Sequence, residues 1–502
     1  MWRVAAAASI AAWVGACLAP DAQPGKAAGS SSGGTPGGSG GGGGGGGEAS
    51  TDVSATWVKP YGSGSSQAAR AIAADASGNV IVGGIYAYET LVMDPVTLPN
   101  AQQTDAFVAK LTPDGEVLWA RGIGGAGDQT LHGLAVDPKD GTIVIAGIFN
   151  QSLDTMQCEL LSGFGGSDVF VVKLSPDDGS CLWSRAFGDA AEQSAFSLAI
   201  DASQNIVVAG TFTGTLDFGP PTAPLMIVDD PDVNGDFTEI FVARLDMDGK
   251  PLSSRSIGDA AFNPMQTSLG VAVDTLNDIV VTGSFEGGIA TPGDPIYNQG
   301  QVDLFLTKLK ADSLATAWSL TSGDAMSSTQ YGRVIAVDPS NTIYFGGYYT
   351  GEISLNGAPI PAGPDLDVFL AAVDPLGKPL WGKRIGGIGN QYVTGLAVDA
   401  SSDLLLGGMF SGVLDFGDGG TLVGSDVMPS GTLDPYVAKL SPGGDRIWSF
   451  QGTGPDQQYV LDVAPAPNGA YAAGWLQNSA KFGDISVASA GAEDIFILKL
   501  TD

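Results

Sequence analysis

The sequence contains little of what histidine-dependent enzymes, disulfide scaffolds and nucleic-acid-binding proteins need. Among 502 residues there are one histidine, His132, and three cysteines, which excludes a disulfide-rich scaffold and most histidine-dependent chemistry. Bases are also scarce, because 22 lysines and arginines stand against 54 acids and give a formal net charge of −32. Such a chain repels phosphate backbones and anionic membrane surfaces, so we expect no nucleic-acid partner.

Glycine, in contrast, is in excess, with 74 copies. The strict three-residue glycine period of collagen is absent, and a hydrophobic share of 44% is too high for a wholly disordered chain. We therefore expect a large folded core, in which the glycines have a structural cause.

The first 16 residues have the pattern of a bacterial export signal. Arg3 supplies a positive charge, and Val4 to Ala16 form an apolar run that is shorter than the about 20 residues needed to span a bilayer. The run leads into Val14-Gly15-Ala16-Cys17, which resembles the lipobox of bacterial lipoproteins and implies lipidation of Cys17. We predict a signal peptide over residues 1–16 and a lipid-anchored location in the cell envelope, at the outer membrane or cell surface. The alternative, if the lipobox is not used, is secretion.

Residues 17–51 form a predicted flexible linker behind this cysteine. They contain eight consecutive glycines, Gly40 to Gly47, and almost no large apolar side chains, so they cannot pack a core. About 30 flexible residues reach ~30 Å. No other apolar run is long enough to span a membrane, so we expect membrane contact only through the lipid and a folded part over residues 52–502.

From Trp57 onward the chain repeats itself. In each unit a glutamine is followed eight residues later by an aspartate, except in the last unit, where proline stands in its place. The pairs are Gln67/Asp75, Gln129/Asp137, Gln193/Asp201, Gln266/Asp274, Gln330/Asp338, Gln391/Asp399 and Gln457/Pro465. Their spacing predicts seven units of about 64 residues.

Each unit contains four short apolar runs separated by turn residues, which is typical of a four-stranded antiparallel blade. Small residues recur six positions after the glutamines, where innermost strands would be crowded. Tryptophans recur near the end of most units, where outer strands diverge, and Phe or Tyr recurs on the third run. We predict an all-β, seven-bladed β-propeller. The tryptophans are Trp119, Trp183, Trp318, Trp381 and Trp448.

The last unit stops before a fourth run, and residues 54–62 near the N-terminus align with residues 116–124 of the first unit. We therefore predict that the N-terminal strand completes the last blade and closes the ring.

Segments such as Leu198-Ala-Ile-Asp201 and Asp105-Ala-Phe-Val-Ala-Lys-Leu111 resemble the SBBP-type repeat of bacterial surface and secreted proteins, a seven-bladed β-propeller, over residues 57–502. Gly-Thr-Leu-Asp217-Phe-Gly and Gly-Val-Leu-Asp415-Phe-Gly are further similar to elements of tethered bacterial lipoproteins. The resemblance implies a fold and an envelope location but no activity.

Two sevenfold series have both a functional and a structural interpretation. The glutamines could form a polar ring around one mouth of the central channel for a sugar or peptide, or they could brace the backbone of a neighbouring blade, which we favour. An acid opens every third run, and sevenfold repetition favours a structural cap there. These acids are Asp105, Asp168, Glu239, Asp303, Asp367, Asp434 and Asp494.

The third unit carries an acidic loop that departs from the repeat. Its oxygen-bearing residues alternate with other residues, as in a calcium-binding loop. The twelfth position of such a loop, counted from Asp230, holds Phe241 instead of a glutamate, so a solvated acidic turn remains the alternative. The candidate calcium ligands are Asp230, Asp232, Asn234, Asp236 and Glu239.

Cys158 and Cys181 fall in one unit of an exported chain, where oxidation is permitted. Because a strand of roughly 20 Å would separate them, we expect two separate buried thiols rather than a disulfide. His132 occupies a position that holds Arg70, Phe196 and Arg333 in other units, which indicates a variable channel-side residue.

Three functions fit this pattern. The tether, the regular repeats and the lack of a unique catalytic cluster favour a monomeric, non-enzymatic binding or scaffold module for an envelope protein or glycan. The alternative is an extracytoplasmic polysaccharide hydrolase or lyase that uses carboxylates. Quinone-dependent oxidation is the least favoured, because the tryptophans belong to outer strands. No catalytic residue and no cofactor other than calcium is predicted.

Overall fold

The computed structural model describes residues 53–100, 103–155, 157–227, 238–258, 266–289, 296–299, 301–323, 328–355, 358–426 and 431–502. These residues belong to one compact unit, Val53–Asp502. All regular elements in the described part are strands. None of the described residues forms a helix that is long and apolar enough to cross a membrane.

Six four-stranded antiparallel sets of consecutive long strands follow one another along the described residues; five are separate sheets, and the sixth is joined through the β37–β39 pairing to the strands of the last set. The first three are β2(Gln67–Ala74)-β3(Val80–Ala87)-β6(Thr104–Leu111)-β7(Val117–Ile123), β8(Gln129–Val136)-β9(Ile143–Phe149)-β12(Asp168–Leu174)-β13(Cys181–Phe187), and β14(Gln193–Ile200)-β15(Ile206–Phe212)-β18(Glu239–Leu245)-β19(Pro251–Ile257). The next three are β20(Gln266–Val273)-β21(Ile279–Phe285)-β24(Asp303–Leu309)-β25(Thr316–Ser322), β26(Gln330–Val337)-β27(Ile343–Tyr349)-β30(Asp367–Val373)-β31(Pro379–Ile385), and β32(Gln391–Val398)-β33(Leu404–Phe410)-β36(Asp434–Leu440)-β37(Arg446–Thr453).

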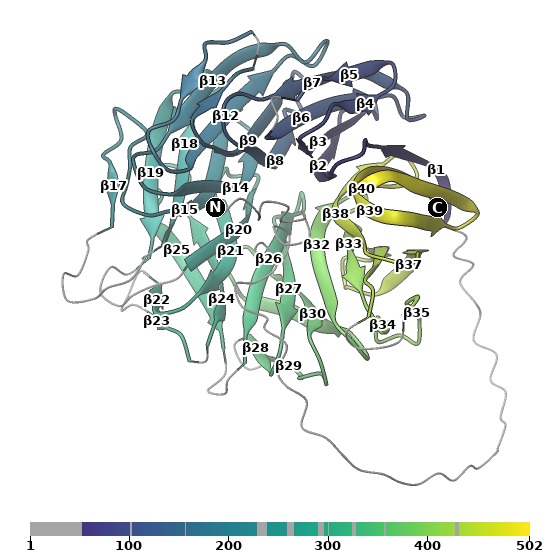
Figure 1. Cartoon of the computed structure of the whole chain (residues 1–502). Coiled ribbons are helices and arrows are strands. Elements are labelled where there is room, and N and C mark those ends of the chain that lie inside the picture. The colour runs from purple at the N-terminus through teal and green to yellow at the C-terminus, as the bar shows by residue number, and fades with distance from the viewer. Residues whose placement is uncertain are drawn as a thin grey trace, which may run out of the picture. The chain divides into compact units, whose positions relative to one another are not determined.

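The seventh sheet joins both ends of the folded unit. Strands β38(Gln458–Ala466), β39(Gly469–Phe482) and β40(Ile485–Thr501) pair in order, and β1(Ser54–Tyr61) adds antiparallel to the outer edge of β40. In Figure 1 the purple β1 lies beside the yellow β40. The structure thus places the N-terminal strand where the last repeat lacks one.

The first strands of the sheets are in contact in a cycle. The strand β2 lies against β8, and the same relationship links β8 to β14, β14 to β20, β20 to β26, β26 to β32, β32 to β38 and β38 to β2. Figure 1 shows the sheets following one another in chain order. We call these seven the inner strands.

Short hairpins follow the second strand of the first six sheets. Where the contacts are described, a hairpin lies against the outer strand of its own sheet, as β5(Val96–Leu98) does against β7. It also lies against the outer strand of the preceding sheet, as β4(Leu91–Met93) does against β1. The hairpins are β4(Leu91–Met93)/β5(Val96–Leu98), β10(Ser152–Leu153)/β11(Leu161–Ser162), β16(Thr215–Leu216)/β17(Leu225–Met226), β22(Gly288–Ile289)/β23(Ile296–Tyr297), β28(Ile353–Leu355)/β29(Ala358–Ile360) and β34(Val413–Asp415)/β35(Thr421–Val423).

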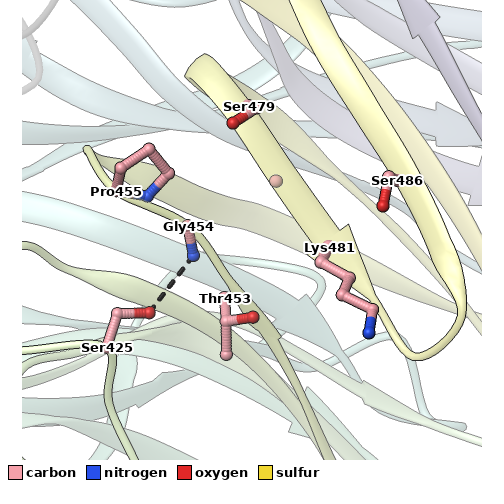
Figure 2. Close-up of a pocket in the computed structure, with 8 residues that line it drawn as sticks. Ser425, Thr453, Gly454, Pro455, Ser479, Lys481 and Ser486 are labelled. Carbon is pink, nitrogen blue, oxygen red and sulfur yellow. Dashed lines mark hydrogen bonds between the residues drawn. The ribbon is translucent and has the colours of Figure 1, made fainter.

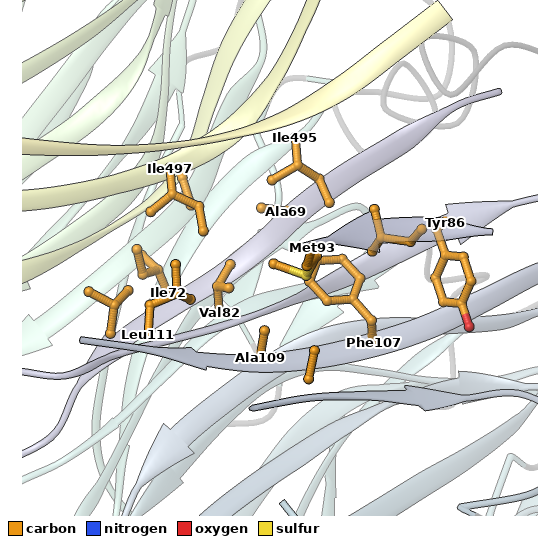
Figure 3. Packing of buried hydrophobic residues seen from close by; sticks show 14 of the residues in the cluster. Ala69, Ile72, Val82, Tyr86, Met93, Phe107, Ala109, Leu111, Ile495 and Ile497 are labelled. Atoms are coloured by element: carbon orange, nitrogen blue, oxygen red, sulfur yellow. The ribbon is translucent and has the colours of Figure 1, made fainter. Parts of the chain in front are cut away.

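The hydrophobic core lies between neighbouring sheets rather than inside any one of them. Figure 3 shows one such layer, in which Ile495 and Ile497 of the seventh sheet pack against Ile72, Val82 and other residues of the first. Each third strand contributes a fully buried aromatic ring to these layers, as the repeat predicts. These rings are Phe107, Phe170, Phe241, Phe305, Phe369, Tyr436 and Phe496.

Tryptophans of several outer strands form hydrogen bonds to the following sheet. The indole Nε1 of Trp119 donates to the Pro176 carbonyl in the tight turn of the following sheet, at 3.3 Å. Equivalent bonds run from Trp183 to Met247, from Trp318 to Pro375 and from Trp381 to Pro442. The predicted wedge between outer strands is confirmed, with an additional hydrogen bond between the sheets.

Part of the glycine excess has a steric cause on the second strands. A Cβ built on Gly210 would lie 1.9 Å from the Ser194 carbonyl oxygen of the adjacent inner strand. The same approach recurs elsewhere in the repeat, for example at Gly84 and Gly408, each 2.0 Å from such an oxygen. Only a residue without a Cβ fits there.

Candidate functional site

The repeated glutamines lie at the starts of the inner strands and are fully buried wherever their side chains are described. The amide Nε2 of Gln129 donates to the carbonyls of Ala126, Gly127 and Ser152 at 2.9–3.1 Å, and Gln391 bonds to Ile388, Ser411 and Val413 in the same way. These bonds go to the connection before each inner strand and to the glutamine's own sheet, not to a neighbouring sheet as the favoured bracing interpretation expected. The glutamines described with their burial are Gln67, Gln129, Gln193, Gln330 and Gln391.

The seventh glutamine was assigned one residue too early. Gln458, not Gln457, begins β38 and is fully buried, and it pairs with Leu476 as Gln391 pairs with Phe410. Gln457 lies in the preceding connection, where its Oε1 accepts a hydrogen bond from the Leu433 backbone. The error arose because the eight-residue spacing to an aspartate fails in this unit.

The repeated aspartates close the tight turns after the inner strands. Asp201 Oδ1 accepts from the backbone N–H groups of Ser203 and Asn205, both at 2.8 Å, and its Oδ2 pairs with Arg244 at 2.9 Å. An Asx turn of this kind explains the fixed position of the residue. Both residues of the repeat signature are therefore structural.

The acids that open the third strands are buried caps, as expected from their repetition. Asp168 Oδ2 accepts from the Phe164 N–H at 2.8 Å, Asp303 from Gln299 at 2.8 Å, and Asp494 from Ala490 at 2.6 Å. Burial raises the pKa of Asp168 and Asp494 to about 6. Asp367 instead pairs with the Arg384 guanidinium at 2.7 Å, although burial still raises its pKa.

The candidate calcium ligands Asp230, Asp232, Asn234 and Asp236 lie outside the described residues. Glu239, the fifth, begins β18, pairs with Phe212 and is buried. No group of three or more His, Cys, Asp or Glu side chains that could hold a metal ion occurs in the described part of the chain. The signal residues 1–16, Cys17 and the linker over 17–51 also lie outside it.

The expectation of two separate thiols was wrong, because Cys158 and Cys181 form a disulfide with their Cα atoms 5.8 Å apart. The connection between β9 and β12 does not stay at one end of the sheet. It folds back along the outer strand, so that β11 contacts β13 and Gln157 Oε1 accepts from the Cys181 N–H. The loop thus brings Cys158 along the length of β13 to Cys181.

The residues that do not follow the repeat gather at bulges in the inner strands. Each inner strand skips one residue in its pairing with the second strand, as β2 does between Ala69 and Ala71. A bulge re-aims the extra side chain. We call the skipped residues whose side chains are described, all partly exposed, the inner belt: Arg70, His132, Phe196, Arg333, Thr394 and Leu461. The prediction that His132 occupies the position held by Arg70, Phe196 and Arg333 in other units is confirmed.

Three neighbouring side chains of the inner belt, Arg70, His132 and Phe196, are in contact. Arg70 Nη1 lies 3.3 Å from His132 Nδ1, and the His132 and Phe196 rings meet edge to face at 5.5 Å. Burial, together with the positive charges of Arg70 and Arg333, holds the pKa of His132 well below its ordinary value. The imidazole is therefore neutral at pH 7.

A second non-repeating feature is an open hollow of about 350 Å³ beside the last two sheets. In the seventh sheet the flanking hairpin is not a separate pair of strands but the continuation of β39 and β40, which crosses to β37 through the Thr453–Lys481 pairing. Ser479 and Lys481 lie on one side of the hollow, and Thr453 and Ser425 on the other (Figure 2).

More of the surface of the hollow is apolar than polar, although several hydroxyl side chains line it. Ser425 Oγ donates to Asp434 Oδ1 at 2.9 Å and accepts from the Gly454 N–H at 3.2 Å, which fixes one wall. Ser486 pairs with Lys481 across the hairpin and completes the other wall. Sequence reasoning missed this hollow, because a long hairpin that spans two sheets leaves no repeated signature.

No protein-family model matches the chain. The uncharacterized WD repeat-containing protein L264 of Acanthamoeba polyphaga mimivirus is 25% identical over 339 residues, which is 56% of this chain and 24% of that protein. Regulatory protein FlaEY of Caulobacter vibrioides is 25% identical over 403 residues, 74% of this chain and 39% of that protein. The chain thus spans about a quarter and about two fifths of the length of these curated relatives.

Among solved structures, Sqt1 from Chaetomium thermophilum aligns with 89% of the chain and all of its own, at 12% identity and a TM-score of 0.40. The WD40 β-propeller domain of Doa1 aligns with 89% of the chain and 97% of its own, at 11% identity and a TM-score of 0.42. The repeating antiparallel sheets and the similarity to a WD-repeat protein support an all-β, β-propeller repeat protein.

Proposed function

We propose that the chain is a lipid-anchored, seven-bladed β-propeller of the SBBP type that binds a glycan of the bacterial cell envelope without catalysing a reaction. The ring closes through β1, and a linker behind Cys17 holds it away from the membrane. A protein partner, with the propeller as a scaffold, is the alternative occupant.

The hollow at the last two sheets is the observation that carries this proposal. A volume of about 350 Å³ suits one or two sugar units. Its serine and threonine hydroxyls both donate and accept, which matches the hydroxyl groups of a sugar. Lys481 adds a cation that suits an acidic sugar. The polar residues of the repeat, in contrast, are occupied by the fold itself.

Binding of the purified full-length protein to an array of bacterial envelope glycans tests the proposal. Thr453→Val and Lys481→Met remove one hydroxyl and one ammonium from the hollow and should weaken binding of the selected glycan about tenfold each. Lys378→Met, in an exposed turn distant along the chain, is the matched control and should leave binding unchanged. A glycan that binds equally to all four proteins, or no bound glycan, would contradict this role of the hollow.

The envelope location is tested separately. Replacement of the lipidated residue, Cys17→Ser, should move the protein from the membrane fraction to the soluble fraction of the expressing bacterium. A membrane-bound Cys17→Ser variant would refute the lipid anchor but not the binding site.

A further inference from the structure

The outer strands carry their own series of bulges, one in each sheet. Each outer strand skips one residue in its pairing with the adjacent strand, immediately before the position that most units fill with tryptophan. A bulge re-aims the side chain of the skipped residue. In five sheets this residue is a large, exposed aliphatic side chain: Leu118, Leu182, Leu252, Leu380 and Ile447.

The strand pairing itself does not require a leucine at this bulge. The fourth and seventh sheets hold Ala317 and Thr56 at the same position, and their outer strands pair with the same one-residue shift. An exposed leucine costs contact with water, and here it recurs where a smaller or more polar residue also serves. The recurrence therefore indicates a cause outside the fold, such as a surface that another molecule covers.

Two of these leucines belong to sheets that are joined at this rim. Trp119, next to Leu118, donates to the Pro176 carbonyl oxygen in the turn that leads into β13. A Cβ built on Gly179 of the same turn would lie 2.6 Å from the Trp119 ring, so the turn packs on the indole. Leu182 follows this turn directly, in β13.

The disulfide brings a third leucine to the same part of the rim. Cys181, next to Leu182, is bonded to Cys158, so the residues that follow Cys158, including Leu160, are held beside β13. The contact of β11 with β13 continues this arrangement. The side chains of Leu118, Leu160 and Leu182 are 52, 59 and 51% exposed. We call these three residues the rim patch.

Exposed acids flank the rim patch. Among the described residues only one of them, Glu116, forms an ion pair, with Lys59 at 3.3 Å. Two further bases approach the turn before β13, but Arg121 packs its stem beside Gly179 and the buried Lys110 pairs with Asp75. Acids therefore outnumber bases around the leucines. These acids are Asp114, Glu116, Glu159, Asp177 and Asp178.

We propose that the rim patch binds a partner protein through a segment in which apolar side chains stand between lysines or arginines. The leucines supply apolar contact area, and the flanking acids attract and orient the basic residues. Because the disulfide holds the loop of Leu160 in place before binding, less freedom is lost when the partner docks. This surface is separate from the hollow at the last two sheets and does not depend on the proposed glycan binding.

A labelled synthetic peptide of leucine and lysine is the probe, and its fluorescence anisotropy is followed during titration with the purified full-length protein. The same peptide with glutamate in place of lysine forms a second arm. We expect saturable binding of the leucine–lysine peptide and at least tenfold weaker binding of the leucine–glutamate peptide, because the acids that flank the patch repel it.

The variants Leu118→Ser and Leu182→Ser should each weaken binding of the leucine–lysine peptide about tenfold, because each removes apolar contact area without a change of charge. Leu376→Ser, at a leucine that is 82% exposed in a turn of the fifth sheet, is the matched control and should bind as wild type does. The Cys158→Ser/Cys181→Ser variant frees the loop and should also weaken binding. Leu160→Ser makes the same test with the disulfide intact, in case the double variant does not fold.

The proposal is overturned if the leucine variants bind the peptide as tightly as wild type, since the attraction would then come from net charge alone. It is equally overturned if Leu376→Ser weakens binding as much as the patch variants, or if the leucine–glutamate peptide binds equally well. Absence of binding of the leucine–lysine peptide up to about 100 μM protein would contradict it as well.

Discussion

The indole Nε1 of Trp57 donates a hydrogen bond to the Pro113 carbonyl oxygen at 3.1 Å. Trp57 lies in β1, at the start of the folded unit, and Pro113 lies in the tight turn between β6 and β7 of the first sheet. The same bond links Trp119 to Pro176 and Trp381 to Pro442. The strand β1 therefore contacts the first sheet in the way that other outer strands contact the sheet that follows them.

The close approach of second strands to inner strands predicts strict intolerance of side chains at certain glycines. Gly210→Ala should lower stability by more than about 3 kcal/mol, because its Cβ would lie 1.9 Å from a backbone oxygen that cannot move alone. Gly443→Ala, whose Cβ would have no neighbour nearer than 3.6 Å, is the control. Thermal melting and soluble yield compare the two. Equal tolerance of both substitutions would disprove this explanation of the glycine excess.

The disulfide between Cys158 and Cys181 closes a loop of 23 residues in sequence separation. A crosslink of this length stabilises a fold by about 3 kcal/mol, mainly through the unfolded chain. We expect reduction to lower the melting temperature and to expose the connection between β10 and β11 to proteolysis. The Cys158→Ser/Cys181→Ser variant should melt like the reduced protein and should not respond to reductant. A wild-type protein with fully titratable thiols and an unchanged melting curve would contradict the prediction.

Burial of Asp168 predicts a specific pH dependence. Its pKa rises from 3.8 to about 6 in the fold, so its contribution to stability is full below about pH 4 and is lost as the pH rises through 6. Asp168→Asn keeps an acceptor for the Phe164 N–H and cannot ionise. It should raise the melting temperature over wild type by roughly 2 °C at pH 8 and change it little at pH 4.

The exposed Asp177→Asn variant removes the same charge and is the control for this pH effect. A stabilisation by Asp168→Asn that is equal at both pH values, or shared by Asp177→Asn, would show that ionisation of Asp168 is not its cause.

The parts of the fold that recur in the sequence could be predicted from it. Four-stranded antiparallel sheets, the turn aspartates and the tryptophan wedges each leave a signature in several units, so chance is a poor explanation for them. The position of Gln458 was missed by one residue, because the last unit lacks the aspartate that fixes the register elsewhere.

Features formed once in the chain were harder to predict. The Cys158–Cys181 pairing depends on a loop that folds back along β13, and the hollow depends on the length of the β39–β40 hairpin. The inner belt was recognised as a variable position, but a bulge is a matter of backbone pairing and has no residue signature. What recurs in the sequence therefore defined the scaffold, while the candidate binding sites emerged from the structure.

The ring's closure by β1 is the central claim of this account, since the hollow lies beside the seventh sheet that β1 completes. The strand pairs antiparallel with β40, with one irregularity between Ala55 and Trp57, and contributes Val58 to the core between the last two sheets. Its loss would also expose the edge of β40 and remove the Trp57 bond to the first sheet.

Thermal melting of a full chain that lacks residues 52–62 tests closure directly, with Trp57→Phe as a milder variant. The account predicts that the deletion lowers the melting temperature by roughly 10 °C, that Trp57→Phe lowers it slightly, and that a synthetic peptide of residues 52–62 restores part of the loss. An unchanged melting curve after the deletion would contradict it.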